Sequence, residues 1–552
     1  MQGAGETGGA GGAGGGAKGG AGGAAKGGAG SAATGGALGA IERLGNRLPD
    51  PATLFLLATG LVLVFSQLAA SLGWSVEKTT LGPGGPITTR VEPVSLLSSE
   101  GLHWLVSSLV VNFRDFPPLA IVLVGMLGIG LAERSGFLPA LLRASLARVP
   151  ARWLSPLVVF VGVNSSLATD AGYVVLPPIA AALFLAAGRS PVAGAAAAFA
   201  GVAGGFGANL VITGLDPLLA GLTESGARLV DPAYRVAATS NWWLMIASTF
   251  LLTGVGWAVA DRVVEPRTAR AASAPAEPAA TPATPAEPAA APGGLSREER
   301  RGLRAGLLAL VLTVAAIALA VLVPGAPLHG ADGATPRWVA AIVPLMFLAT
   351  ALPGLAHGVA AGSVRSDRDA ARMLGETMAA MGPYVVLAFF AGQFVASFGH
   401  SRLGEMLAVA GGELLARAAL PTALLLALFV VGVAGLDLAM ASMSAKYAFL
   451  APVFVPMFMQ VGVSPELTQA AYRVGDSVAN TVAPLNPYLV ILLVVVQRYQ
   501  PGAGIGTLVA LMLPYAAAFG VAWTALLLLW VALGLPLGPA GPLHYPAAAP
   551  LP

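Results

Sequence analysis

The stretch "AYRVGDSVANTVAPLNP" at residues 471–487 places charged and amide side chains where a membrane-spanning helix is expected. Apolar sequence lies on both sides, "LAPVFVPMFMQVGV" before it and "YLVILLVVV" after it. The stretch contains Arg473, Asp476 and Asn480, followed by Pro484 and Pro487. An ionisable residue at membrane depth is costly and usually faces a cavity or a charged partner. The stretch therefore predicts a broken helix that carries a functional site.

The composition indicates a polytopic membrane protein. The 552 residues are 56% hydrophobic and only 10% charged, whereas soluble domains carry roughly 25% charged residues. There is no cysteine, which excludes disulfides, thiolate metal sites and cysteine nucleophiles. The net charge of +3 is too small to indicate nucleic-acid binding. The N-terminal sequence lacks the apolar core of a signal peptide, so the first apolar segment is expected to remain as an uncleaved anchor.

The apolar segments predict an all-α fold with nine transmembrane helices and two re-entrant hairpins. A spanning helix needs about 20 mostly apolar residues. Nine segments qualify, at 53–73, 117–133, 192–222, 239–260, 303–323, 337–353, 377–399, 466–496 and 507–534. The stretches 154–187 and 420–461 are apolar but interrupted by polar, glycine and proline residues. Broken backbone at membrane depth is tolerated only inside protein or beside water, so we expect a hairpin at each.

Two low-complexity stretches divide the chain. Residues 1–38 form a Gly/Ala-rich tail and residues 266–300 a Pro/Ala-rich linker, which separates a first membrane half (39–265) from a second (301–540), before a short tail at 541–552. The positive-inside rule predicts a cytoplasmic N-terminus and linker. It rests on Arg43, Arg47, Arg134, Arg143, Arg148, Arg152, Arg262, Arg267, Arg270, Arg297, Arg300, Arg301, Arg304, Arg365, Arg368 and Arg372. Nine crossings would then place the C-terminus outside.

The two halves contain an internal repeat. The segment "YVVLPPIAAALFLAAGRSP" (173–191) matches "YAFLAPVFVPMFMQVGVSP" (447–465) at a constant separation of 274 positions. The identical pairs are Tyr173 and Tyr447, Leu176 and Leu450, Pro178 and Pro452, Gly188 and Gly462, Ser190 and Ser464, and Pro191 and Pro465. An odd number of predicted spans lies between the segments, so the two hairpins should enter from opposite faces. Such an inverted repeat with broken helices is typical of a secondary transporter.

The polar residues of the predicted breaks suit an anionic substrate and a coupling ion. Arg473 can hold a carboxylate with two hydrogen bonds. Asp476 or Asp170 can carry a proton or ligate Na⁺. Small polar side chains at or near the hairpin tips are expected beside them, namely Asn164, Ser165, Ser166, Ser442 and Ser444. The alternative is that Arg473 and Asp476, three residues apart on one helix, only neutralise each other.

Three further charged or amide residues allow more than one interpretation. Lys446 either extends its ammonium group to the membrane surface or pairs with Asp437, and we place both ahead of substrate binding. Asp216 and Asn486 occupy equivalent Leu-x-Pro breaks, where each suits a helix cap as well as a ligand.

The chain resembles the AbgT family, the p-aminobenzoyl-glutamate transporters, from about residue 41 to residue 540. The resemblance rests on the segments "IERLGNRLPDPATLF", "VVNFRDFPPL", "VLVGMLGIGLAERSGFLPALLR", "NSSLATDAGYVVLPP", "SMSAKYAFLAPVFVPMFM" and "SPELTQAAYRVGDSVANTVAPLNPYLVILLVVVQRY". It implies a homodimer in a bacterial-type inner membrane, with nine spans and two opposed hairpins per subunit. It also implies transport of p-aminobenzoyl-glutamate, or export of p-aminobenzoate-like sulfonamide antimetabolites, coupled to a proton or sodium gradient.

The resemblance also points to particular residues. Positions that the family associates with transport match Asp170, Ser444, Tyr447, Pro465, Arg473, Asp476 and Pro484. Tyr447 stands where some members carry tryptophan. The resemblance and the pattern of polar breaks together lead us to expect that the substrate is bound by Arg473, Ser444, Tyr447, Asn480, Pro465 and Pro484. We expect ion or proton coupling by Asp170, Asp476, Asn164, Ser165 and Ser166, with no catalytic residue, no cofactor, and no metal other than a coupling Na⁺. The expected partners are a small aromatic carboxylate, the lipid bilayer and a second subunit.

Three other classes of protein compete with this interpretation. A dicarboxylate symporter or a cation/proton antiporter can share the hairpin architecture, and fold analogy does not choose the substrate. An intramembrane enzyme would need a metal motif or a nucleophile with a base. All five histidines lie in or near loops, which leaves only Ser442 or Ser444 with Lys446. A passive channel is the third, although buried acids beside broken helices suit alternating access better.

Overall fold

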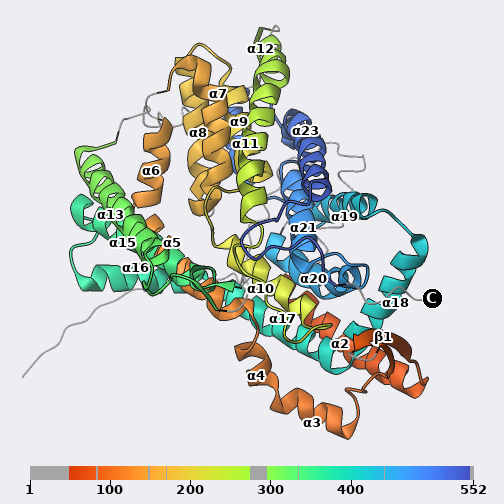
Figure 1. Ribbon diagram of the computed structural model, residues 1–552. Coiled ribbons are helices and arrows are strands. Elements are labelled where there is room, and N and C mark those ends of the chain that lie inside the picture. Colours follow the sequence, from red (N-terminus) through yellow and green to blue (C-terminus); the bar gives the residue numbers. More distant parts are fainter. Residues whose placement is uncertain are drawn as a thin grey trace, which may run out of the picture.

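The computed structural model describes residues 49–82, 85–146, 149–168, 171–273, 295–332, 335–440 and 442–546, and these form a mostly helical protein. Figure 1 shows α7, α8, α9 and α11 running side by side, with α13 and α15 on one flank and α19, α20 and α21 on the other. The predicted tail 1–38 lies outside the described residues, as does most of the predicted linker.

The first half contains eleven described helices and one β-hairpin. The helices are α2 (Pro51–Ser71), α3 (Ser99–Ser107), α4 (Leu109–Arg114), α5 (Pro118–Arg134), α6 (Phe137–Leu146), α7 (Leu154–Asn164), α8 (Ala171–Ala186), α9 (Pro191–Gly204), α10 (Leu215–Ala227), α11 (Trp242–Val259) and α12 (Glu265–Ser273). Strands β1 (Val76–Gly82) and β2 (Gly85–Val91) pair antiparallel after α2.

The second half repeats this order. Its helices are α13 (Arg297–Leu322), α14 (Arg337–Ala340), α15 (Ile342–Ala361), α16 (Asp367–Ala380), α17 (Gly382–His400), α18 (Leu403–Ala418), α19 (Thr422–Asp437), α20 (Met443–Gln460), α21 (Pro465–Asn480), α22 (Tyr488–Gln497) and α23 (Ile505–Ala532). A short antiparallel pair, β3 (Ala331–Asp332) and β4 (Thr335–Pro336), again follows the first helix. Helices α12 and α13 extend into the two ends of the predicted linker, and residues 274–294 between them lie outside the described part.

Six helices in the described ranges are long and apolar enough to cross a membrane, and the pair α5 and α6, bent by 62°, would make a seventh. The predicted spans 192–222 and 466–496 are wrong as continuous helices. Each is a buried helix, a break and a second helix: α9 and α10 in the first half, α21 and α22 in the second. In the second half, Pro484 and Pro487 cause part of this, because proline has no N–H to donate within a helix and displaces the preceding residue from helical conformation.

The two stretches predicted as hairpins each form two α-helices, with a short interruption of the α-helical conformation between them. Residues 154–187 form α7 and α8, with a 3-10 turn at Ser165–Ala168 between them. Residues 420–461 form α19 and α20, with a break after Asp437. Helix α7 packs on α9 as α19 packs on α21, so the buried helix of each half lies against its own hairpin.

The repeated Gly-x-Ser-Pro segment makes the same turn in both halves. Gly188 and Gly462 have positive φ angles of 72° and 83°, which glycine adopts without steric cost. The Oγ atoms of Ser190 and Ser464 then accept hydrogen bonds from the first turns of α9 and α21. Proline follows at the first helical position of both, where its missing N–H costs nothing. The turn therefore delivers the chain from each hairpin into the buried helix.

Large apolar side chains cover the outer surface of several helices. Helix α13 exposes Leu308, Val311, Leu312, Leu319 and Leu322, and α2 exposes a similar row. Exposed apolar area on this scale marks contact with lipid or another protein. Together with the long apolar helices, it describes an integral membrane protein.

Candidate functional site

Helix α21 lies at the centre of the site, and all 16 of its residues are buried. Arg473 forms an ion pair with Asp216, with 2.6 Å between Nη2 and Oδ1. Its Nη1 donates to the carbonyl oxygen of Gly207 at 3.4 Å and contacts the sulfur of Met245 at 2.9 Å. The guanidinium group of Arg473, in the second half of the chain, is thus bound by Gly207 in the break between α9 and α10 and by Asp216 at the start of α10, both in the first half.

Asp216 has two roles in that break. Besides accepting from Arg473, its Oδ2 accepts hydrogen bonds from the backbone N–H and the hydroxyl of Thr213, at 2.6 and 3.0 Å. The residue therefore both holds the turn that precedes α10 and acts as the counter-ion of Arg473. Its counterpart Asn486 makes only local bonds, accepting from the N–H of Tyr488 and donating to the carbonyl of Asn480.

A second buried ion cluster lies near Asp476 on α21. The Nζ of Lys446 is 2.8 Å from Oδ1 of Asp476 and also pairs with Asp437. All three side chains are 0% exposed, so Lys446 does not reach the membrane surface, and its predicted pairing with Asp437 is present. The local alternative for Arg473 and Asp476 is not observed, because each is paired with a residue on another element.

The predicted residues of the first hairpin tip bind backbone and side chains of the neighbouring break. Asn164 donates to the carbonyl of Phe160 at 2.9 Å and accepts from the N–H of Leu210 at 3.1 Å. Ser166 donates to Oδ1 of Asn209, and Ser165 donates to the carbonyl of Gly162 at 2.6 Å. Asp170, expected to take part in coupling, lies outside the described residues.

A cavity of about 580 Å³ joins the two hairpin tips. Ser166 of the first tip and Ser444 of the second both line it. The remaining walls come mainly from α5, the start of α10, and α16 with α17: Val122, Met126, Gly130, Glu133, Arg134, Phe206, Gly214, Leu215, Leu218, Thr377, Ala380, Met381 and Tyr384. The hydroxyl of Tyr384 is buried and has no hydrogen-bond partner among the described residues. The cavity thus combines a mostly apolar wall with a few converging polar groups, as small-molecule sites do.

The other predicted substrate residues, Arg473 among them, do not line this cavity. Tyr447 is buried, shares a 2.8 Å hydrogen bond with Thr223 and stacks on Tyr472 with 4.2 Å between ring centroids. Asn480 donates to Oδ2 of Asp476 at 3.0 Å. Pro465 begins α21, and Pro484 lies in the break before α22. In this conformation these residues position the charged groups.

Several cavity residues were missed by the sequence reasoning. Tyr384, Met381 and Thr377 belong to segments that look like an ordinary membrane span and its flank, and Met126 lies in a plain apolar helix. The only available signal was the tyrosine that follows a Gly-Pro pair at the start of α17.

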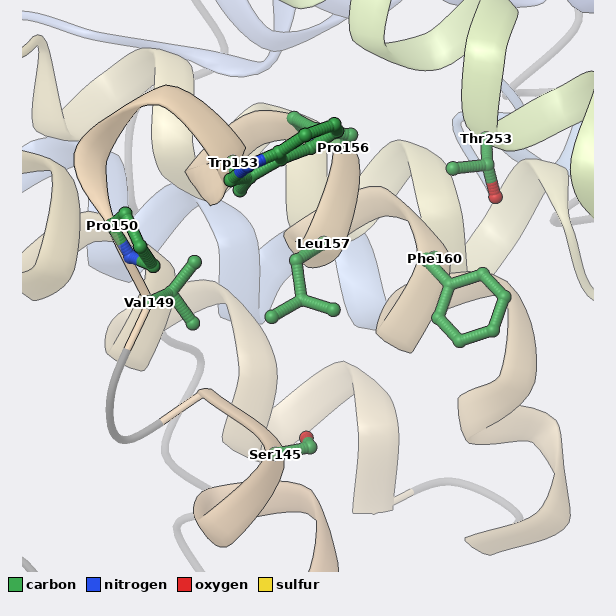
Figure 2. A pocket seen from close by; sticks show the side chains of 8 residues that line it. All are labelled: Ser145, Val149, Pro150, Trp153, Pro156, Leu157, Phe160 and Thr253. Carbon is green, nitrogen blue, oxygen red and sulfur yellow. The ribbon is translucent and has the colours of Figure 1, made fainter.

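A second cavity of about 420 Å³ lies elsewhere, between the end of α6, the start of α7 and α11. Figure 2 shows its lining, in which Leu157 and Phe160 lie along α7 and Thr253 faces them from α11. Trp153 on its rim is 53% exposed. This hollow is apolar and contains none of the buried ion pairs, so it is not the candidate site.

Buried ion pairs at two broken helices, next to a cavity and surrounded by long apolar helices, define an integral membrane transporter. The chain belongs to the AbgT putative transporter family, whose sequence profile matches residues 36–545. This confirms the resemblance found in the sequence, and the family and its relatives are transporters, not enzymes.

Three similar proteins are informative. The p-aminobenzoyl-glutamate transport protein of Escherichia coli (strain K12) is 36% identical over 507 residues, which cover 91% of this chain and 96% of the relative. The structure of the Alcanivorax borkumensis YdaH transporter superposes with a TM-score of 0.81 at 41% identity, covering 89% of this chain and all of the other. Neisseria gonorrhoeae MtrF, described as illuminating a class of antimetabolite efflux pumps, gives 0.82 at 37% identity, covering 92% of this chain and all of the other.

Proposed function

We propose that this protein is an ion-coupled secondary transporter of p-aminobenzoyl-glutamate or related p-aminobenzoate-like compounds. The proposal includes uptake of such compounds or efflux of sulfonamide antimetabolites, by a homodimer in the bacterial inner membrane with cytoplasmic N-termini. This substrate class is supported by the Escherichia coli relative, a p-aminobenzoyl-glutamate transport protein, and by MtrF, described as illuminating a class of antimetabolite efflux pumps.

The observation that carries the proposal is that Ser166 and Ser444, from the tips of the two hairpins, line one cavity. In secondary transporters with inverted repeats, the substrate binds near the membrane midplane between the repeats. A cavity shared by both tips is such a place. Movement of one hairpin relative to the other would open it first to one side and then to the other.

The bases of the two hairpins have different neighbours, which supports entry from opposite faces. At the base of the first, Arg189 pairs with Asp261 and Glu265, which lie next to the linker predicted to be cytoplasmic. At the base of the second, the hydroxyl of Ser464 donates to the carbonyl of Pro542 in the C-terminal segment, predicted to lie outside. Residues 541–546 therefore pack on this base.

Within this function, we assign Arg473 to a substrate carboxylate. Asp216 is itself a carboxylate bound to the guanidinium group, so it marks the place that a substrate carboxylate would take. Substrate binding would then exchange one carboxylate for another without leaving the buried cation unpaired, which would be costly. Ser444 lines the cavity, and Arg473 is bonded to Gly207, which directly follows the lining residue Phe206. Tyr447, Pro465 and Asn480 belong to α20 and α21, and Pro484 lies in the break that follows them.

We assign ion or proton coupling to Asp476 and Asp170, with Asn164, Ser165 and Ser166 positioning the first tip. Asp476 is fully buried and takes part in the second ion cluster, where a change of charge would have a large effect on the electrostatic free energy. Either a proton or Na⁺ would satisfy this general assignment.

The test is flux of labelled p-aminobenzoyl-glutamate into proteoliposomes under imposed pH and Na⁺ gradients, with a sulfonamide and succinate as competitors. Arg473→Met should lower substrate affinity by at least about tenfold, since charge-assisted hydrogen bonds contribute about 1.5–3 kcal/mol. The matched control is Arg417→Met, which breaks an exposed pair with Glu413. Asp216→Asn should raise affinity, because it weakens the internal competitor. Unchanged affinity in both Arg473→Met and Asp216→Asn would remove Arg473 from the site. Competition by succinate alone would indicate a dicarboxylate transporter.

A further inference from the structure

Three charged side chains contact one another next to the second hairpin tip, between α19 and α20. Asp437 is the last residue of α19, Lys446 lies in the first turn of α20, and Asp476 lies on α21. The ammonium group of Lys446 contacts Oδ1 of both aspartates, and none of the three is exposed. The cluster therefore contains two carboxyl groups and one ammonium group in a fully buried place.

The four carboxyl oxygens of this cluster are not equally occupied. Oδ1 of Asp476 accepts from Lys446 and from the hydroxyl of Tyr472 at 2.9 Å, and its Oδ2 accepts from Asn480 at 3.0 Å. Oδ1 of Asp437 pairs with Lys446. Oδ2 of Asp437 is buried and has no hydrogen-bond partner in the described part of the chain. One carboxyl oxygen of the cluster, Oδ2 of Asp437, is thus free to accept a hydrogen bond or a proton.

The charges of the cluster do not balance. Two carboxylates and one ammonium leave one uncompensated negative charge, and an unpaired charge in a buried place is strongly unfavourable. One additional positive charge would make the cluster neutral. Hard metal cations take several oxygen ligands at once, but here the ammonium of Lys446 already binds Oδ1 of both aspartates. A proton needs a single oxygen, and Oδ2 of Asp437 provides one.

The other titratable groups around the cluster are already engaged. The single hydroxyl proton of Tyr472 is shared between Oδ1 of Asp476 and the carbonyl oxygen of Met443, and Tyr447 is bonded to Thr223. Arg473, three residues before Asp476, is paired with Asp216. Residues 438–440, directly after Asp437, are partly exposed, and Ser442 is exposed.

We propose that Lys446 is a tethered counter-ion that makes the Asp437–Asp476 pair a site for one proton and keeps Na⁺ out of it. This rests on the proposed transport function and names the residues of its coupling step. A proton from one side of the membrane forms an O–H bond at Oδ2 of Asp437, and that bond breaks when the proton leaves to the other side. No other bond changes.

The direct experiment detects the proton without any substrate. In infrared difference spectra of the purified full chain between high and low pH, the C=O band of a protonated carboxylic acid should appear at low pH. Other acidic residues of the chain contribute to this band as well, so the part contributed by Asp437 is the intensity that is lost in Asp437→Asn and retained in Lys78→Met, a control that breaks the partly buried pair of Lys78 with Glu405. Asp437→Asn leaves Lys446 and Asp476 as a neutral pair, so this variant is expected to fold.

The transport experiment uses proteoliposomes and labelled p-aminobenzoyl-glutamate. A pH gradient without Na⁺ should drive accumulation by the natural protein, and Asp437→Asn should lose accumulation by at least about tenfold more than it loses substrate exchange, a difference of about 1.4 kcal/mol. Lys446→Met should make accumulation depend on Na⁺, since the two carboxylates then lack their cation.

Two results would overturn the inference: an acid band of the same intensity in Asp437→Asn as in the natural protein, or accumulation by the natural protein driven by Na⁺ at equal pH. The failure of the proposed function looks different. In that case no gradient drives the substrate, while the infrared band still reports on Asp437.

Discussion

Removing Asp216 should destabilise the protein far more than removing Asp216 and Arg473 together. The two side chains are 0% and 3% exposed, and their ion pair measures 2.6 Å. Arg473 has little else to bind, since its Nε is buried without a partner among the described residues and its Nη1 has only a long bond to Gly207 and a contact with Met245. Asp216→Ala would therefore leave a buried, nearly unsolvated guanidinium group.

The magnitude follows from the geometry. Breaking a buried pair by removing one partner costs about 3–5 kcal/mol. Asp216 also accepts hydrogen bonds from Thr213, and losing them adds about 1 kcal/mol. Asp216→Ala should thus lower the free energy of unfolding by about 4–6 kcal/mol. Arg473→Met should cost about 3 kcal/mol, because Asp216 keeps its two bonds from Thr213. The double variant should cost only about 1–2 kcal/mol, since no unpaired charge remains.

The assay is unfolding in detergent, followed by the fluorescence of the nine tryptophans. A cycle of the two single variants and the double variant isolates the pair. The control cycle is Arg417 with Glu413, whose side chains are 79% and 31% exposed, where we expect a coupling below about 1 kcal/mol. If the double variant at Asp216 and Arg473 is as unstable as the sum of the single variants, the pair is not the buried unit described here.

Three further predictions concern other parts of the chain. Gly207→Ala should destabilise by about 1–3 kcal/mol, because a Cβ there would lie 2.6 Å from Oγ of Ser477. Gly254→Ala should not lower the free energy of unfolding, because a Cβ there has nothing within 4 Å. Unfolding of the two variants in detergent tests this difference. Tyr384→Phe should leave stability unchanged but lower substrate affinity about fivefold if the unpaired hydroxyl binds substrate; equal affinity in a binding titration would exclude that contact. Backbone and side-chain hydrogen bonds at the start of α16, that from the N–H of Arg365 above all, lower the pKa of Asp369 below its ordinary value of 3.8. Its stabilising contribution is therefore complete above that value and lost as the pH falls through the lower, folded-state pKa. Hydrogen exchange in the first turn of α16 should increase only in strong acid, whereas Asp369→Asn should show the increase already at pH 7.

The features that could be predicted from the sequence are those that depend on local chemistry. A glycine at positive φ, a serine cap and a proline at the first helical position act within four residues, so Gly-x-Ser-Pro indicated the same turn twice. Likewise, the prolines and amides at 207–217 and 478–487 indicated polar breaks, although not that each divides a predicted span into two helices.

The features that could not be predicted depend on distant partners. Arg473 has Asp476 three residues away, but its partner Asp216 lies 257 positions earlier in the chain. Periodicity places residues on a helix face without saying what packs against that face. The cavity has the same origin: Tyr384 and Met126 look like ordinary apolar-helix residues, and only the packing of α5 and α17 around the tips makes a hollow between them.

The two halves of the chain are interleaved and do not simply lie next to each other. Helix α20 of the second half packs on α10 of the first, and α8 of the first packs on α22 of the second, where Tyr173 stacks on Tyr488 with 4.2 Å between ring centroids. Each half therefore provides helices against which helices of the other half pack. A gene divided between the codons for residues 273 and 295 should give two fragments that are degraded when made singly and that rebuild a working carrier when made in the same cell.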